Sequence, residues 1–345
     1  MEILQYDFMQ RALLASLMVG LVAPAVGIFL VQRRLSLLGD GLGHVALTGV
    51  GVGVLTSTAP VGAALVAAVL GAVVIELVRA RGRTSGDVAL AVLFYGGIAG
   101  GVVLLSLAPR GQATNLDAFL FGAITTTTQG DVVAFAVISA AVVGAVWVLG
   151  QRLYAVSDDE EYARAVGLPV LGLNLVLAGL VAATVVLSMR VVGLLLISAL
   201  MIVPSAIAQL LARSFRQALL LACSVGLAVS VSGTTASYYT STPSGGTIVL
   251  LAIALFLLVS VGVALREATG NRRHRRRAAI HGAHPHDHGA DCGHPALPHE
   301  DHVDYDHDGH LHAPHLTDRG VHYDEHGTDG NGASGDRAST GRSAT

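Results

Sequence analysis

A carboxylate and an imidazole lie four residues apart in an apolar stretch near the N-terminus. Asp40 and His44 enclose Gly-Leu-Gly, and His44 is the only histidine before residue 270, whereas the other 14 follow it. Residues four apart on a helix share one face, and carboxylate oxygen and imidazole nitrogen are donors for Zn²⁺ or Mn²⁺. The pair therefore predicts a divalent-metal site on a transport path. An Asp that caps the helix and a His that hydrogen-bonds a neighbour would give the same spacing.

The last 75 residues hold a second set of candidate ligands. Histidines are interleaved there with aspartates, and neutral imidazoles in such runs bind Zn²⁺, Ni²⁺ or Cu²⁺. Their irregular spacing predicts several loose, exchangeable metal sites, and a low-complexity linker without a role is the alternative. The predicted tail ligands are His281, His284, His286, His288, His294, His299, His302, His307, His310, His312 and His315.

Composition indicates what kind of protein must position these groups. Of 345 residues, 52% are hydrophobic and 13% charged, and the mean hydropathy of +0.62 is that of a membrane protein. All 21 basic residues are Arg, so the chain has no P-loop lysine and is not itself an ATPase, and no enzyme activity of its own is expected. A net charge of −3 gives no indication of a nucleic-acid partner.

Apolar windows long enough to cross a bilayer predict nine spans in an all-α polytopic membrane protein. A shorter apolar patch at 117–124 predicts a re-entrant or interfacial helix. At the end of the third span, Glu76 and Arg79 are interpreted as snorkelling side chains. The predicted spans are 12–31, 41–56, 61–78, 88–108, 131–150, 170–187, 191–212, 217–237 and 247–265.

Arginines divide unevenly between the two sides of this nine-span arrangement. Fifteen lie on one side, and only Arg11, Arg110 and Arg190 lie on the other. Because positive charge favours the cytoplasm, we expect the N-terminus outside and the C-terminus in the cytoplasm. The predicted organisation is a transmembrane domain at 1–270 and a cytoplasmic His/Asp-rich tail at 271–345, whose low apolar content predicts disorder.

Four ordered segments resemble the permease subunits of ATP-binding-cassette (ABC) transporters for zinc, manganese and iron. Residues 36–49, SLLGDGLGHVALTG, resemble the signature of that family, in which a Ser precedes Asp and His four apart and a Gly follows. Residues 158–169 are similar to its cytoplasmic loop, 192–204 to a characteristic transmembrane stretch, and 243–245 to the segment before the last span. The resemblance covers about residues 10–266.

By this resemblance, the chain is the permease of a divalent-metal importer in the bacterial inner membrane. It implies a homodimer in which two Asp40/His44 pairs face one path, a separate cytoplasmic ABC ATPase and an extracytoplasmic metal-binding protein. No permanently bound cofactor is expected. The tail favours zinc as the transported metal, with manganese or iron as alternatives. One departure from the family is Thr48, where Pro often precedes the glycine.

The loop that follows residue 150 contains a run of acids and then a glycine, a pattern that predicts a short helix. A solvated surface helix is one interpretation, and the resemblance implies a coupling helix that docks on the ATPase. The predicted coupling residues are Asp159, Glu160, Glu161, Tyr162, Arg164 and Gly167.

A stand-alone secondary carrier or exporter is the rival function, but it would be expected to spread more ligands over several spans.

Overall fold

The computed structural model separates the chain into two compact units, Met1–Val263 and Ala264–Thr345. The described residues are 5–81, 86–107, 120, 122, 128–189, 193–194, 197–281, 293–299, 302–307, 310–317 and 320–326.

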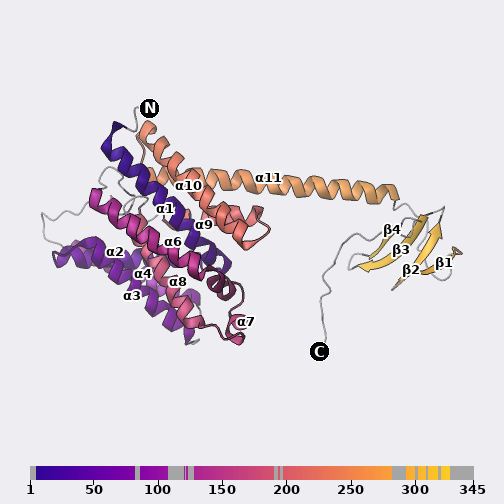
Figure 1. The fold of residues 1–345 in the computed structure, drawn as a ribbon, viewed down its shortest axis with the longest axis horizontal. Coiled ribbons are helices and arrows are strands. Elements are labelled where there is room, and N and C mark those ends of the chain that lie inside the picture. Colours follow the sequence, from indigo (N-terminus) through magenta and orange to yellow (C-terminus); the bar gives the residue numbers. More distant parts are fainter. Residues whose placement is uncertain are drawn as a thin grey trace. The chain divides into compact units, whose positions relative to one another are not determined.

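The first unit is a bundle of helices (Figure 1). Within the described ranges, eight helices are long and apolar enough to span a membrane, which confirms an all-α polytopic membrane protein. The helices are α1 (Asp7–Gln32), α2 (Leu38–Leu55), α3 (Pro60–Ala80), α4 (Gly86–Ser106), α6 (Gln129–Asp158), α7 (Glu160–Ala165), α8 (Val170–Met189), α9 (Ile197–Leu211), α10 (Phe215–Thr240) and α11 (Ser244–His281).

The seventh predicted span is shorter than expected. Helix α9 occupies most of the window 191–212 but has only 15 residues, fewer than the roughly 20 that a bilayer requires. Residues 190–192 and 195–196 lie outside the described part of the chain. The interfacial helix expected at 117–124 also lies outside it, apart from two residues, so that prediction is not tested.

Local sequence signals fix where several helices begin. At the start of α6, Thr128 and Asp131 form a capping box: the Asp131 amide donates to Thr128 Oγ1 at 3.2 Å, and the Thr128 amide donates to Asp131 Oδ2 at 2.9 Å. Helix α3 begins at Pro60, whose fixed φ and missing N–H suit a first helical position.

Helix α2 packs against α3, α4, α8 and α9. Glycines permit its closest contacts: a Cβ at Gly49 would lie 2.6 Å from the carbonyl oxygen of Ala63 on α3, and one at Gly97 of α4 would lie 2.6 Å from the carbonyl carbon of His44. Any larger residue at these positions would force the helices apart. This packing holds α2 in a fixed place within the bundle.

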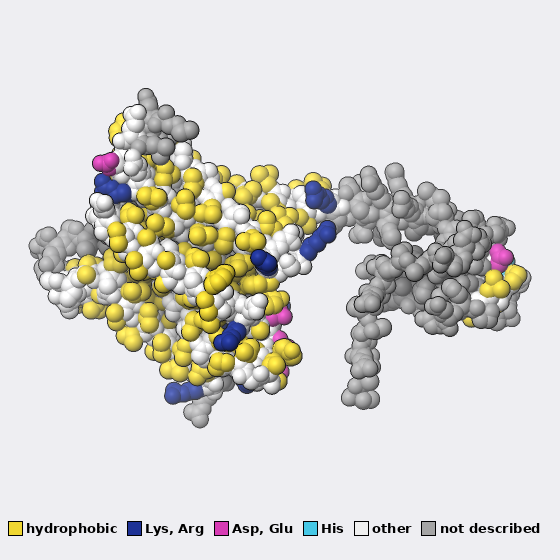
Figure 2. Space-filling model, viewed as in Figure 1, with side chains coloured by type: hydrophobic (Ala, Val, Ile, Leu, Met, Phe, Trp, Pro, Cys, Tyr) yellow, Lys and Arg dark blue, Asp and Glu magenta, His cyan; other side chains and the backbone are white. Residues whose placement is uncertain are grey.

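The outer face of the bundle is largely apolar (Figure 2). Side chains such as Trp147, which is 86% exposed, and Leu258, which is 71% exposed, point away from the core. A surface of this kind would associate in water, whereas it matches the hydrocarbon interior of a membrane.

The second unit includes an antiparallel sheet, where the sequence predicted a tail without regular structure. Strands β1 (Ala296–His299), β2 (His302–His307), β3 (His310–Thr317) and β4 (Gly320–His326) pair in chain order. The expectation of disorder was based on low apolar content. It overlooked the alternation of Val and Tyr with His and Asp in β2 and β4, which is the period of a strand.

Candidate metal path and coupling site

Asp40 lies in the first turn of α2 but does not cap it. The N-cap residue is Leu37, which makes no side-chain capping hydrogen bond, and Asp40 follows as the third helical residue. The cap interpretation of Asp40 is therefore wrong. The carboxylate is half-buried, one helical turn from His44 and on the same face, so that the two side chains are available to one ligand.

The imidazole of His44 is buried and incompletely satisfied. His44 as a whole residue is 8% exposed, and its Nδ1 atom has no hydrogen-bond partner among the described residues. The ring meets Phe94 of α4 edge to face, with 4.4 Å between ring centroids. A buried nitrogen without a partner costs free energy, whereas a cation would use its lone pair. The geometry therefore fits a metal ligand better than a histidine bonded to its neighbours.

A further polar group beside the start of α2 was not singled out from the sequence. Ser198 of α9 is 4% exposed, and its Oγ has no hydrogen-bond partner among the described residues. A Cβ at Gly39 would lie 3.0 Å from this Oγ, which places the hydroxyl next to the residue before Asp40. Its signal in the sequence was a small polar residue within the characteristic stretch 192–204.

Thr48 connects α2 to α4. Its Oγ1 donates a 2.7 Å hydrogen bond to the carbonyl oxygen of Gly97, in the segment of α4 that packs against His44. A proline at this position could not make the bond. This departure from the family pattern therefore has a structural role, since it fixes the helix that supports the His44 ring.

The predicted short helix after residue 158 is present as α7, six residues long. Asp159 is its N-cap and accepts a 2.9 Å hydrogen bond from the Tyr162 amide, while Gly167 follows the helix at φ +82°, a conformation that favours glycine. Tyr162 is 64% exposed and Glu161 is also exposed. The exposed side of α7 is therefore available to a partner.

Glu160 ties α7 to the bundle. Its Oε2 lies 3.4 Å from Arg33 Nη2 at the end of α1, and its Oε1 lies 3.0 Å from Arg164 Nη2. The Arg33 side chain is 5% exposed. Burial lowers the pKa of the Arg33 guanidinium, and the nearby Glu76 carboxylate opposes that shift. A guanidinium stays charged at physiological pH, so it requires these carboxylates.

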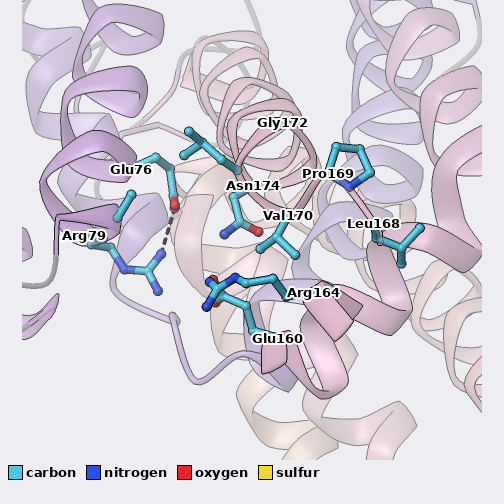
Figure 3. A pocket seen from close by; sticks show the side chains of 11 residues that line it. Glu76, Arg79, Glu160, Arg164, Leu168, Pro169, Val170, Gly172 and Asn174 are labelled. Atoms are coloured by element: carbon cyan, nitrogen blue, oxygen red, sulfur yellow. Dashed lines mark hydrogen bonds and ion pairs between the residues drawn. The ribbon is translucent and has the colours of Figure 1, made fainter. Parts of the chain in front are cut away.

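Glu76 is a residue whose burial the sequence did not indicate. It is 2% exposed and forms a 2.8 Å ion pair with Arg79, so the prediction that it snorkels to an interface is wrong. Together with Asn174 of α8, the pair lines a cavity of about 630 Å³ that Glu160 and Arg164 also face (Figure 3). The Oδ1 atom of Asn174 is buried without a partner among the described residues. Three helices, α3, α7 and α8, thus meet at one polar cavity.

The predicted tail ligands lie in four places along the chain. His284, His286 and His288 lie outside the described residues, and His281 is the last residue of α11. His294 precedes β1. The remaining predicted ligands lie on strands: His299 on β1, His302 and His307 on β2, and His310, His312 and His315 on β3.

Comparison with known proteins gives a consistent set of matches. A model of the ABC 3 transport family matches residues 5–263. The chain is 31% identical over 256 residues to a probable metal transport system membrane protein of Treponema pallidum, with 74% of this chain and 96% of that protein covered. It is also 31% identical over 259 residues to the manganese transport system membrane protein MntC of Listeria innocua, covering 74% and 91% of the two chains.

A solved structure shares both fold and sequence with the helical unit. It is PsaBC from Streptococcus pneumoniae in complex with Fab, with a TM-score of 0.68 and 31% identity over 74% of this chain and 92% of that one. The Treponema protein, the Listeria protein and the PsaBC structure each match 74% of this chain, which leaves about a quarter of it uncovered.

Proposed function

The chain belongs to the ABC 3 transport family, and from this premise we propose that it is the permease subunit of an ATP-driven importer of a divalent transition metal. The observation that carries the proposal is the buried His44 imidazole, whose unpartnered Nδ1 lies one turn from a carboxylate that caps nothing. As a multi-pass protein, the chain resides in the bacterial cell membrane. The predicted orientation, with the C-terminus in the cytoplasm, is part of the proposal.

Two copies of the chain would complete the metal site. Asp40 and His44 supply one oxygen and one nitrogen, whereas transition-metal sites generally use four ligands or more. A homodimer with both pairs on a shared path provides two of each. Two weak donors per subunit also suit transport, because an ion must leave the site as readily as it enters.

Energy must come from a second protein, because a chain without lysine has no P-loop lysine. We propose that α7 is the surface on which a cytoplasmic ABC ATPase docks. Exposed Tyr162 and Glu161 are available for this contact, while buried Ala163 and the Arg33–Glu160 pair anchor the helix. Arg79 and Arg164, both assigned to the cytoplasmic side, line the polar cavity beside α7, and Arg33 pairs with Glu160, which also lines it, in keeping with that orientation. An extracytoplasmic metal-binding protein would deliver the ion.

Two observations favour different metals as the cargo. The His/Asp-rich tail favours zinc, because manganese prefers oxygen donors. The Listeria relative is named for manganese transport, which supports manganese. Asp40 with His44 accommodates either ion, so zinc and manganese are both candidates. Zinc is placed first because the tail of this chain favours it.

We further propose that the tail binds metal that has reached the cytoplasm and acts in capture, buffering or sensing. Its imidazoles bind late transition metals, and the aspartates between them add oxygen donors.

The rival function, a stand-alone secondary carrier or exporter, would use ionisable ligands spread over several spans. Within the described helices no group of three or more such ligands gathers.

Metal accumulation tests the proposed function. In cells that lack this chain, zinc and manganese contents are measured with each metal limiting in turn, before and after the gene is restored. An importer restores uptake of one metal at limiting concentration, and only when its ATPase is active. Uptake that persists with a hydrolysis-deficient ATPase would overturn the ABC assignment of the activity, and lower cellular metal on restoration would indicate an exporter.

A further inference from the structure

Each of the three hairpins in the tail sheet opposes one histidine with another. The register of the strands sets these pairs, and each ladder contains one. The pairs are His299 with His302, His307 with His310, and His315 with His322.

Opposed positions of an antiparallel pair share one face of the sheet, with Cβ atoms about 4.5–5.5 Å apart. Zinc binds an imidazole nitrogen at roughly 2.0–2.1 Å, so one ion can be held by two opposed histidines. Histidines spaced irregularly along the chain thus become pairs of regular spacing across the sheet.

A third donor follows two residues further along one strand of each hairpin. Residues i and i+2 of a strand lie on the same face, so this donor shares the face of its pair. The third donors are Asp304 after His302, His312 after His310, and Asp324 after His322.

We propose that each tail hairpin holds one late first-row divalent metal ion, such as Zn²⁺, between its opposed histidines and this third donor. Three protein ligands leave one position open, which suits a site that exchanges its ion. The inference rests on the proposed metal-binding role of the tail and deepens it. Loose sites expected from sequence spacing become three sites set by strand register.

The sequence of β4 shows why register matters. Within β4, Val321 and Tyr323 alternate with His322 and Asp324, so neighbouring positions of the strand belong to opposite faces of the sheet. A shift of one residue would exchange the two faces. Metal binding across the strands would also add free energy that favours the paired strands.

An exchange of neighbouring residues tests register without changing composition. The full-length protein in detergent is titrated with Zn²⁺ against a chromophoric chelator, and a variant lacking residues 279–327 gives the background. The double variant Val321→His/His322→Val keeps the histidine count but removes His322 from its register position. We expect one of three tight sites to weaken about tenfold or more, since loss of outer-shell partners alone costs about 10–100-fold.

Two matched variants separate ligation from folding. His288→Gly/Gly289→His makes the same kind of exchange before the first strand, and we expect unchanged affinity. His322→Cys keeps a zinc ligand at the same register position, and we expect it to retain the tight site. A register exchange without effect, or a cysteine variant as weak as the exchange, would overturn the inference. Full-length protein that binds no more Zn²⁺ than the deletion variant would instead refute metal binding by the tail, and neither result bears on transport through Asp40 and His44.

Discussion

Arg33 Nη2 lies 3.4 Å from Glu160 Oε2, and this contact joins the end of the first membrane helix to α7. Arg33 is also the residue after α1, and seven residues later the chain reaches Asp40. A movement imposed on α7 by a docked ATPase would therefore act directly on the segment that leads into the metal pair. We therefore propose that this ion pair transmits movement from the proposed docking helix to the proposed path.

Neutralising this link should uncouple the ATPase from transport. In Glu160→Gln, the nearly buried Arg33 guanidinium loses its charged partner and α7 loses its anchor. We expect the reconstituted transporter to retain most of its ATP hydrolysis while metal transported per ATP falls severalfold. Arg152→Gln is the control, because it removes an exposed charge at the end of α6 that is not among the predicted coupling residues. Equal effects of the two variants would contradict the link.

The metal pair itself gives the sharpest test of the path. Asp40→Asn removes the carboxylate charge and His44→Gln removes the imidazole nitrogen, and we expect each to lower metal uptake to the level of cells without the chain, with membrane insertion intact. Asp131→Asn is the control, since Asp131 also lies in the first turn of a spanning helix but serves as a cap. Retained uptake in both path variants would refute the role of these residues.

How much of this site the sequence predicts depends on the sequence separation of its parts. Asp40 and His44 are four residues apart, so helical periodicity alone places them on one face. Arg33 and Glu160 are 127 residues apart, and no local pattern links them. The burial of Glu76 was missed for the same reason, because its environment comes from helices distant in sequence.

Features of the fold that are set by local sequence are likewise predicted better than those that depend on residues distant in sequence. Apolar length predicts the spanning helices, since each satisfies its own backbone hydrogen bonds whatever its neighbours. It overestimated α9, because Gly193 and Leu194 fall within the predicted span but are not helical, and the helix begins at Ile197. For the tail, composition alone indicated disorder, although the alternation around Val321 and Tyr323 is typical of a strand.

Thr48 should stabilise the α2–α4 contact through its hydrogen bond to the Gly97 carbonyl. Thr48→Val keeps the shape but leaves that acceptor without the bond, and we expect a loss of about 0.6–2 kcal/mol in unfolding free energy. Thr235→Val is the control, because the Thr235 hydroxyl bonds only within its own helix. Thermal unfolding in detergent measures both. A loss in the control as large as that in Thr48→Val would refute a specific interhelical role.

The buried pair of Glu76 and Arg79 should contribute to stability only as a pair. Glu76→Met leaves Arg79 charged at the cavity, and we expect a clear fall in thermal stability, on the order of 1–3 kcal/mol. Glu76→Met/Arg79→Met removes both charges and should recover much of the loss. A double-mutant cycle measures this coupling. Additive losses would show that the two side chains act independently.

The tail should affect the fate of the ion rather than its passage. It is distinct from the compact helical unit that carries Asp40 and His44, so removing residues 279–327 leaves the proposed path unchanged. We expect the initial rate of metal uptake to stay within about twofold of the intact chain, because the two donors of the path remain. Metal retained after transfer to metal-free medium should decrease, because the imidazoles proposed to hold it are gone. Radioactive zinc measures both quantities in the same cells. A large fall in the initial rate with unchanged retention would reverse these roles and place the tail on the transport path.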